Sequence, residues 1–264
     1  GSTIQHLSLG VNIKDKWMES MLTGDVKKRD IWMRLLKKRA ETGYPYITFH
    51  DTINNGGPQE YKDLGLEIKG SNLCSEIALY SGSYGGGQSY VCCLASMNLL
   101  TFDDWVDTDA VELMVYFLDL VMEEYIKKTE GVPFLDHARN FAIQQRAIGL
   151  GTLGYHSYLQ SKGVPFESFD AKMFNTKSHK IISERALDAS KVLATEFGEP
   201  EMLVGSGRRN MTLMAIAPTT SSSFILGQVS PSIEPLASNY YTKDLAKGKF
   251  TYKNPYLMEL LEEL

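Results

Sequence analysis

The feature that most constrains the fold is an alternation of short apolar strands with longer amphipathic helices. The expected strands cover residues 46–49, 72–79, 89–94 and 212–217. The expected helices cover residues 25–42, 109–128, 141–160, 175–197 and 255–264. Strands separated by helices are typical of α/β proteins with parallel sheets. The sequence therefore predicts an α/β fold with mainly parallel strands.

Two of these helices carry signals at their ends. In the helix over residues 25–42, Gly43 follows as a C-terminal stop. Thr108 is a cap residue for the helix over 109–128. The apolar face expected on that second helix consists of Met114, Phe117, Leu118, Val121 and Tyr125. Loops are expected at residues 54–58 and 81–87, where glycine is frequent.

The length and charge of the chain limit its function. A chain of 264 residues suits one large domain or two smaller ones. The net charge of −5 implies no broad nucleic-acid-binding surface, and the basic clusters at 27–29 and 37–39 are interpreted as the solvated face of a helix. No apolar run could span a bilayer, so we expect no membrane partner. Nothing resembles a signal peptide, and we expect a cytoplasmic protein with reduced thiols.

The segment Asn72-Leu-Cys-Ser-Glu76 carries the strongest chemical signal. On a strand, side chains alternate between faces, so Asn72, Cys74 and Glu76 would lie on one side. An amide, a thiol and a carboxylate would then be close enough to act together. The competing interpretation is a buried, inert cysteine in an ordinary strand.

A second signal is the segment Ala215-Ile-Ala-Pro-Thr-Thr-Ser-Ser-Ser223. A strand that ends in small hydroxyl residues before a helix directs backbone N–H groups and hydroxyls outward, which suits a phosphate. Threonine and serine are also common helix caps, so this pattern alone is weak. The candidate phosphate-binding residues are Pro218, Thr219, Thr220, Ser221 and Ser222.

Two other kinds of site are conceivable. A cysteine hydrolase could pair Cys74 with His50, His137 or His156, but no family signature surrounds the cysteine. A metal site is not expected, because the chain has no C-x-x-C motif. Neighbouring residues on a strand also point to opposite sides, which separates the two adjacent cysteines at 92 and 93.

Four segments together resemble the large catalytic subunit of ribonucleotide reductase. They are Asn72-Leu-Cys-Ser-Glu76, Val91-Cys-Cys-Leu-Ala-Ser-Met-Asn-Leu99, Arg146-Ala-Ile-Gly-Leu-Gly151 and Ala217-Pro-Thr-Thr-Ser-Ser222. Their order and separations fit, and the resemblance covers nearly the whole chain. It implies part of a ten-stranded α/β barrel, incomplete in this chain, with residues 1–264 forming a single barrel fragment.

The resemblance also implies a role for each site residue. Cys74 would carry the transient thiyl radical that abstracts the 3′ hydrogen of the ribose. Glu76 would take the proton of the 3′ hydroxyl, and Asn72 would orient the sugar. Cys92 would be one member of the redox-active dithiol pair, and residues 218–222 would hold the phosphates.

Several parts of the family are expected to lie outside this sequence. The redox partner of Cys92, the amino-terminal regulatory domain and most of the ATP and dNTP effector sites would precede it. The tyrosine pair for radical transfer and the mobile cysteine tail would follow Leu264, because Tyr240-Tyr241 stands too close to the phosphate segment to be that pair. Cys93 stands where the family usually has a polar residue, and it has no assigned role. The chain is interpreted as a fragment, or one part of a split catalytic subunit.

The expected partners follow from the same resemblance. They are a ribonucleotide substrate, the remainder of the large subunit and a radical-generating small subunit with a diiron or dimanganese centre, which we favour over adenosylcobalamin. A thioredoxin- or glutaredoxin-type dithiol would supply the reducing equivalents, and no cofactor is expected on this chain. The isolated chain is expected to be inactive as a ribonucleoside-diphosphate reductase. The alternative is a non-catalytic, reductase-like fragment that binds nucleotide and needs another chain to act.

Overall fold

The computed structural model describes residues 7–245 and 248–264, and the chain divides into two compact units. The first unit contains the residues up to Cys92 together with 124–146 and 200–204. The second unit contains residues 93–123, 147–199 and 205–264. Each unit has one parallel pair of strands accompanied by helices, in agreement with the predicted α/β class.

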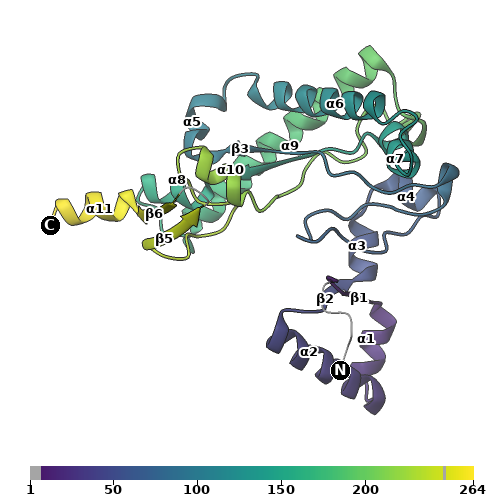
Figure 1. Ribbon diagram of the computed structural model, residues 1–264, viewed down its shortest axis with the longest axis horizontal. Helices are drawn as coiled ribbons and strands as arrows, with labels where there is room; N and C mark the ends of the chain where they lie inside the picture. The colour runs from purple at the N-terminus through teal and green to yellow at the C-terminus, as the bar shows by residue number, and fades with distance from the viewer. Residues whose placement is uncertain (1–6, 246–247) are drawn as a thin grey trace. The chain divides into compact units, whose positions relative to one another are not determined.

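The first unit is built on the parallel pair β1 (Gly10–Ile13) and β2 (Tyr46–Phe49), with Val11 beside Ile47. The crossover between them contains helices α1 (Asp15–Leu22) and α2 (Val26–Thr42), as Figure 1 shows. The other helices of this unit are α3 (His50–Gly56), α4 (Gln59–Asp63), η1 (Tyr84–Gly86), α7 (Asp136–Gln145) and η3 (Glu201–Leu203).

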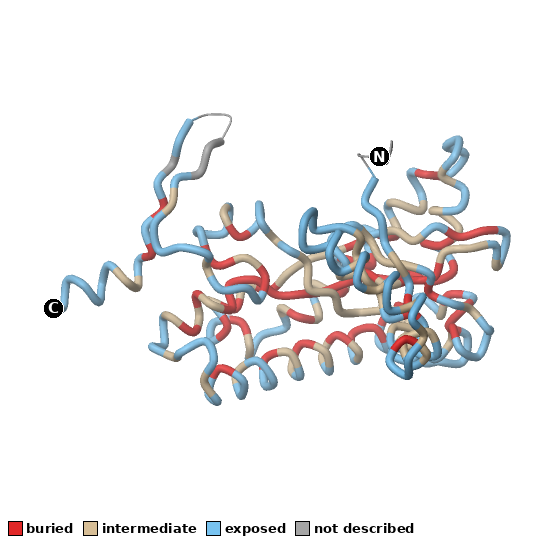
Figure 2. Tube along the Cα trace, turned by 90° about the horizontal axis from the view of Figure 1, so that it is seen from below, coloured by how far each residue is buried: buried red, intermediate tan, exposed pale blue. Residues whose placement is uncertain are grey.

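Helix α2 confirms the helix expected over residues 25–42. Local hydrogen bonding and backbone conformation fix both of its ends. The carboxylate of Asp25 accepts a hydrogen bond from the N–H of Lys28 at 3.1 Å. Gly43 ends the helix at φ 75°, a conformation that favours glycine. Helix α2 has no buried residue. Figure 2 colours the whole described chain by burial.

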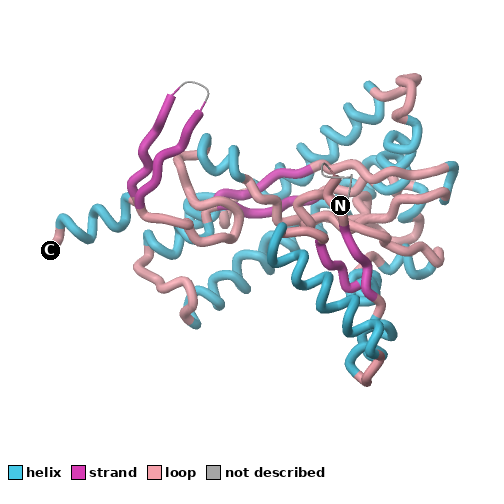
Figure 3. The backbone as a smooth tube through the Cα atoms, turned by 60° about the horizontal axis from the view of Figure 1, so that its bottom comes forward, coloured by secondary structure: helices cyan, strands magenta, loops and turns pink. Residues whose placement is uncertain are grey.

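Three predictions for the first unit were wrong. The expected loop at 54–58 lies partly in helix α3. The expected strand at 72–79 is instead a turn followed by irregular backbone, and the chain between α4 and η1 has no strand (Figure 3). The strand expected at 89–94 begins only at Leu94.

The second unit is built on the parallel pair β3 (Leu94–Asn98) and β4 (Gly149–Leu153). The strand expected at 212–217 is reduced to an isolated parallel bridge between Met214 and Leu150 of β4, in which Leu150 donates to the carbonyl of Leu213 and accepts from the N–H of Ala215. The helices are η2 (Leu99–Thr101), α5 (Phe102–Trp105), α6 (Ala110–Lys128), α8 (Tyr155–Ser161), α9 (Phe169–Phe197), α10 (Thr220–Ile225) and α11 (Pro255–Glu262). The last residues of α6, from Glu124, count with the first unit.

The second unit confirms the long helices and corrects other details. The single helix expected over 141–160 is interrupted by β4. An antiparallel hairpin, β5 (Tyr240–Leu245) and β6 (Gly248–Lys253), was not predicted. The expected apolar face of α6 was misplaced, because Phe117 and Val121 are exposed.

The core of the second unit surrounds strand β4, whose five residues are all buried. The buried residues of α6 are Val111, Val115, Leu118, Asp119 and Met122. Ile182 and Ala186 of α9 are also fully buried. Among the residues that the structure describes, no helix is both long enough and apolar enough to cross a membrane.

Candidate functional site

The cysteine segment forms a closed turn in the first unit. The N–H of Asn72 donates to the carbonyl of Ile77, and the N–H of Ile77 donates back to Oδ1 of Asn72, both at 3.1 Å. Ser75 has φ 69°, an unusual conformation for a residue with a side chain. Cys74 is exposed within this turn. Asn72, Cys74 and Glu76 therefore do not lie along one face of a strand as predicted, because a turn presents the thiol.

The structure nevertheless brings Cys74, Glu76 and Cys92 into one electrostatic neighbourhood. Partial desolvation raises the pKa of the Cys92 thiol although the residue is exposed, and the negative charges of Glu76 and Cys74 raise it further. Burial also raises the pKa of the Tyr90 phenol, and the charges of Cys92 and Glu76 raise it by smaller amounts. These groups therefore lie close enough for the charge of one to affect the ionisation of another.

Glu76 has an unsatisfied acceptor. Its Oε2 is buried and has no hydrogen-bond partner among the described residues. Buried polar atoms in folded proteins nearly always have a partner, and an exception needs a physical explanation. A hydroxyl group of a bound ligand would supply the missing donor.

The two adjacent cysteines have opposite environments. Cys92 is exposed, whereas Cys93 is buried and its Sγ lies 3.5 Å from the carbonyl oxygen of Leu118. All three cysteines are free thiols. In the part of the chain that the structure describes, no group of three or more histidine, cysteine or acidic side chains could hold a metal ion.

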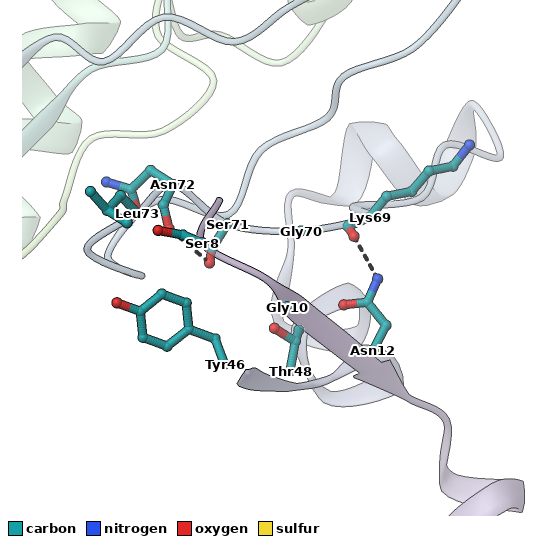
Figure 4. A pocket seen from close by; sticks show the side chains of 10 residues that line it. All are labelled: Ser8, Gly10, Asn12, Tyr46, Thr48, Lys69, Gly70, Ser71, Asn72 and Leu73. Carbon is teal, nitrogen blue, oxygen red and sulfur yellow. Dashed lines mark hydrogen bonds between the residues drawn. The ribbon is translucent and has the colours of Figure 1, made fainter. Parts of the chain in front are cut away.

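A polar cavity of about 470 Å³ lies beside the turn, within the first unit. Its lining residues are Ser8, Gly10, Asn12, Tyr46, Thr48, Lys69, Gly70, Ser71, Asn72 and Leu73. Figure 4 shows Tyr46 and Thr48 of β2 on one side and the segment with Asn72 and Leu73 on the other. The amide of Asn12 donates to the carbonyl of Lys69 at 2.5 Å, which ties β1 to that segment.

Tyr46 is a site residue that the sequence reasoning missed. The pKa of the Tyr46 phenol is raised, mainly by a hydrogen bond with the Tyr44 side chain. Burial and the charges of Tyr44 and Cys74 raise it by smaller amounts. The charge of Cys74 thus affects the ionisation of a residue that lines the cavity. The available signal was its position on the predicted strand 46–49.

The predicted phosphate segment lies in the second unit. Pro218, Thr220, Ser221 and Ser222 are exposed, while Thr219 is half-buried and adopts φ 51°. The hydroxyl of Thr219 accepts a hydrogen bond from the N–H of Ser232 at 2.7 Å. The segment follows the bridge to β4 and leads into α10. Several small hydroxyl side chains are thus open to solvent at the end of an extended segment.

Two of the candidate histidines, His50 and His156, have structural partners. His50 lies 3.7 Å from the carboxylate of Glu67, and Nδ1 of His156 accepts from the N–H of Leu236. Burial lowers the pKa of His156. None of the described hydrogen bonds or ion pairs joins Cys74 to a histidine, so no pairing of the hydrolase type is present there.

The parallel strands, helical crossovers and exposed cysteines define the chain as an α/β domain with a thiol-containing site. Comparison with known proteins identifies the family within this class. Residues 11–203 and 200–264 match the family described as the barrel domain of ribonucleotide reductase. The chain belongs to the ribonucleotide reductase barrel-domain family. This confirms the predicted family and the predicted fold, an incomplete α/β barrel.

Individual relatives support the same assignment. The chain is 44% identical over 239 residues to the ribonucleoside-diphosphate reductase large subunit of Invertebrate iridescent virus 3, covering 90% of this chain and 37% of that protein. It is 37% identical to a putative large subunit from Frog virus 3, covering 98% of this chain and 48% of that protein. The solved Actinobacillus ureae class Id ribonucleotide reductase alpha subunit superimposes with a TM-score of 0.91 and 52% identity, covering 98% of this chain and 48% of that one. This chain spans less than half the length of each of these proteins.

Proposed function

We propose that this chain is the part of a ribonucleotide reductase large subunit that holds the reacting thiol, and that it acts in the reduction of ribonucleotides to 2′-deoxyribonucleotides. The observation that carries the proposal is the placement of Cys74, Glu76 and Cys92 in one electrostatic neighbourhood of a chain from this family. The names of the relatives refer to ribonucleoside diphosphates, so we propose a diphosphate substrate.

Each residue has a role that its environment supports. Cys74, exposed in its turn, would carry the thiyl radical and take the 3′ hydrogen atom of the ribose, becoming a thiol again. The unpartnered Oε2 of Glu76 would accept the hydrogen bond and then the proton of the 3′ hydroxyl. Asn72 uses Oδ1 to close the turn, which leaves its Nδ2 to donate to the sugar. As the 2′ hydroxyl leaves as water, Cys92 and a second thiol would supply two electrons and end as a disulfide.

The segment from Pro218 to Ser222 would hold the phosphates of the substrate. The exposed hydroxyls of Thr220, Ser221 and Ser222 and the backbone N–H groups of the first turn of α10 are suitable donors. Calorimetric titration with a ribonucleoside diphosphate tests this role. Binding that survives replacement of Thr220, Ser221 and Ser222 by alanine would contradict it.

The remaining parts of the reaction would come from partners. We propose a radical-generating small subunit with a diiron or dimanganese centre, which supplies the oxidising equivalent. The remainder of the large subunit would supply the second thiol, and a thioredoxin- or glutaredoxin-type protein would supply electrons. We propose the cytoplasm as the location, where thiols stay reduced.

The decisive experiment reconstitutes the complete large subunit containing this chain with its small subunit. Deoxynucleotide formation is measured for the unchanged protein and for Cys74→Ser. We expect turnover from the first and none from the second, because a hydroxyl cannot replace the thiyl chemistry. Unchanged turnover by Cys74→Ser would exclude the proposed role. Nucleotide binding without any turnover in the reconstituted enzyme would favour the non-catalytic alternative.

A further inference from the structure

A continuous series of buried side-chain hydrogen bonds runs through the first unit. The hydroxyl of Tyr61 on α4 donates to Oε1 of Gln145 on α7, and Nε2 of Gln145 donates to Oε1 of Gln88. Nε2 of Gln88 donates in turn to Oε1 of Gln144 at 2.5 Å. These four residues, which we call the glutamine network, are at most 5% exposed. Such buried polar networks are rigid when every member is satisfied.

The glutamine network contacts both segments that bear the site. The hydroxyl of Tyr61 accepts a hydrogen bond from the N–H of Tyr80, four residues after Glu76. Gln88 stands four residues before Cys92. The segment after Glu76 and the segment before Cys92 are therefore attached to one buried set of side chains.

The turn that joins the two segments rests on the same network. Nε2 of Gln144 donates to the carbonyl of Gly85 at 3.1 Å. The amide of Asn140 donates to the carbonyls of Gly85 and Gly87 at 2.6 and 2.8 Å. A Cβ atom on Gly85 would lie 2.5 Å from the amide of Gln144, so no larger residue fits without movement. The close approach of this backbone to the network thus depends on glycine.

No strand ladder fixes these segments. Between α4 and β3 the described chain has no strand, and a bridge between Gly82 and Gln88 pairs its backbone. Single hydrogen bonds supplement this bridge: the N–H of Ser89 donates to the carbonyl of His137, and the N–H of Tyr90 donates to the hydroxyl of Ser81. Where no strand ladder is present, side chains are the other protein partners of buried backbone groups. The network supplies such partners to Tyr80 and Gly85 and places Gln88 within the segment that leads to Cys92.

We propose that Tyr61, Gln145, Gln88 and Gln144 are positioning residues that hold the Cys92 segment in a fixed relation to Cys74 and Glu76. They touch neither a reacting atom nor a substrate, and they act through the backbone. The inference deepens the proposed function, since it concerns the geometry of the same site. Its test measures thiol geometry and not turnover, so it can fail while the proposed function stands.

The test compares two single-atom deletions in the 264-residue chain. Tyr61→Phe removes the hydroxyl that begins the network. Tyr155→Phe removes another buried phenol hydroxyl, this one in the second unit, which donates to the carbonyl of Ala171 at 2.8 Å. A short thiol–thiol cross-linker is applied, and the Cys74–Cys92 product is quantified by mass spectrometry with thermal unfolding as a parallel measurement.

We expect Tyr61→Phe to lower the yield of the Cys74–Cys92 cross-link by roughly tenfold, because the effective concentration of two groups depends steeply on their placement. Tyr155→Phe should lose thermal stability without this change. Equal cross-linking yields in the two variants, or no such cross-link in the unchanged protein, would overturn the proposal.

A second readout uses the ionisation of Cys92. Because the negative charges of Glu76 and Cys74 contribute to its raised pKa, displacement of Cys92 should shift its alkylation–pH profile to lower pH. We expect this shift in Gln145→Leu, which removes the central amide, and not in Tyr155→Phe. A profile for Gln145→Leu that matches the unchanged protein while the variant remains folded would also contradict the proposal.

Discussion

The boundary between the two units falls between Cys92 and Cys93, and the backbone is held by different hydrogen bonds before and after it. Before this point, the cysteine segments have no strand ladder and depend on side-chain hydrogen bonds. After it, β3 pairs with β4 along five consecutive residues, and residues 212–215 add further backbone hydrogen bonds. Cys92 is an exposed thiol in the first environment, and Cys93 is a buried one in the second.

The difference separates reactivity from stability. In a strand ladder, the backbone N–H and C=O groups pair with each other whatever the side chains are. The side chains of the second unit are therefore free to pack in its core. The irregular segments of the first unit place thiols in the open and leave one carboxylate oxygen unpartnered. Substitutions around the cysteine segments of the first unit should therefore alter chemistry, and those in the strand-paired core of the second unit should alter stability.

The largest expected effect tests the adjacent cysteines directly. In the reconstituted enzyme, Cys92→Ser should abolish turnover driven by a dithiol reductant, because the disulfide can no longer form. Cys93→Ser should retain turnover and lose on the order of 1–3 kcal/mol of stability, since a hydroxyl is costlier to bury than a thiol. Turnover assays and urea unfolding measure the two effects. Loss of turnover in Cys93→Ser with the fold intact would break the comparison.

The next effect concerns the buried ion pair of the second unit. Asp119 accepts from Nε of Arg209 at 2.9 Å and from the amide of Asn210 at 3.0 Å. Asp119→Ala should lower the free energy of unfolding by about 3–5 kcal/mol, because a buried cation loses its counter-charge. Arg34→Ala, which breaks an exposed pair with Asp30, should cost below about 1 kcal/mol. Urea unfolding compares them, and equal losses would contradict the assignment of stability to the second unit.

A smaller effect is expected where the backbone at Ala215 lies close to β4. A Cβ atom on Gly151 of β4 would lie 2.1 Å from the carbonyl oxygen of Ala215. Gly151→Ala should therefore cost about 1–3 kcal/mol and displace the segment that leads to residues 218–222. Gly56→Ala is a suitable control, because nothing lies within 4 Å of its added Cβ. Thermal unfolding and nucleotide titration would show whether stability and binding fall together, as expected, or independently.

The smallest effect is electrostatic. Burial raises the pKa of Cys92 most, and the charge of Glu76 adds to it. The thiolate is the nucleophile, so alkylation of Cys92 should reach its midpoint above the pH usual for a cysteine. Glu76→Gln should lower that midpoint modestly, because the larger contribution of burial remains. Glu41→Gln, an exposed change on α2, should not alter it, and an upward shift in Glu76→Gln would reverse the assigned sign.

A raised pKa also links Cys92 to stability. Between the unfolded and the folded pKa, the folded state binds more protons than the unfolded state. The contribution of Cys92 to stability is therefore complete below the unfolded pKa and declines as pH rises through the folded pKa. The pH dependence of urea unfolding should be weaker in Cys92→Ser over this range.

The sequence by itself determined those parts of the protein that depend on local chemistry. Helix α2 was predictable because Asp25 and Gly43 are signals within one turn of its ends. The family was predictable because the four motifs, among them the segment around Cys74, keep a specific order and spacing.

The tertiary structure decided what long-range contacts control. Asn72, Cys74 and Glu76 looked like one face of a strand, but the paired hydrogen bonds between Asn72 and Ile77 fold them into a turn. Strand β4 was hidden inside an expected helix, because its partners come from distant parts of the sequence. The glutamine network likewise joins Tyr61 to Gln145 across 84 positions. Alternation and periodicity report only on neighbours along the chain, so no local pattern could have revealed these contacts.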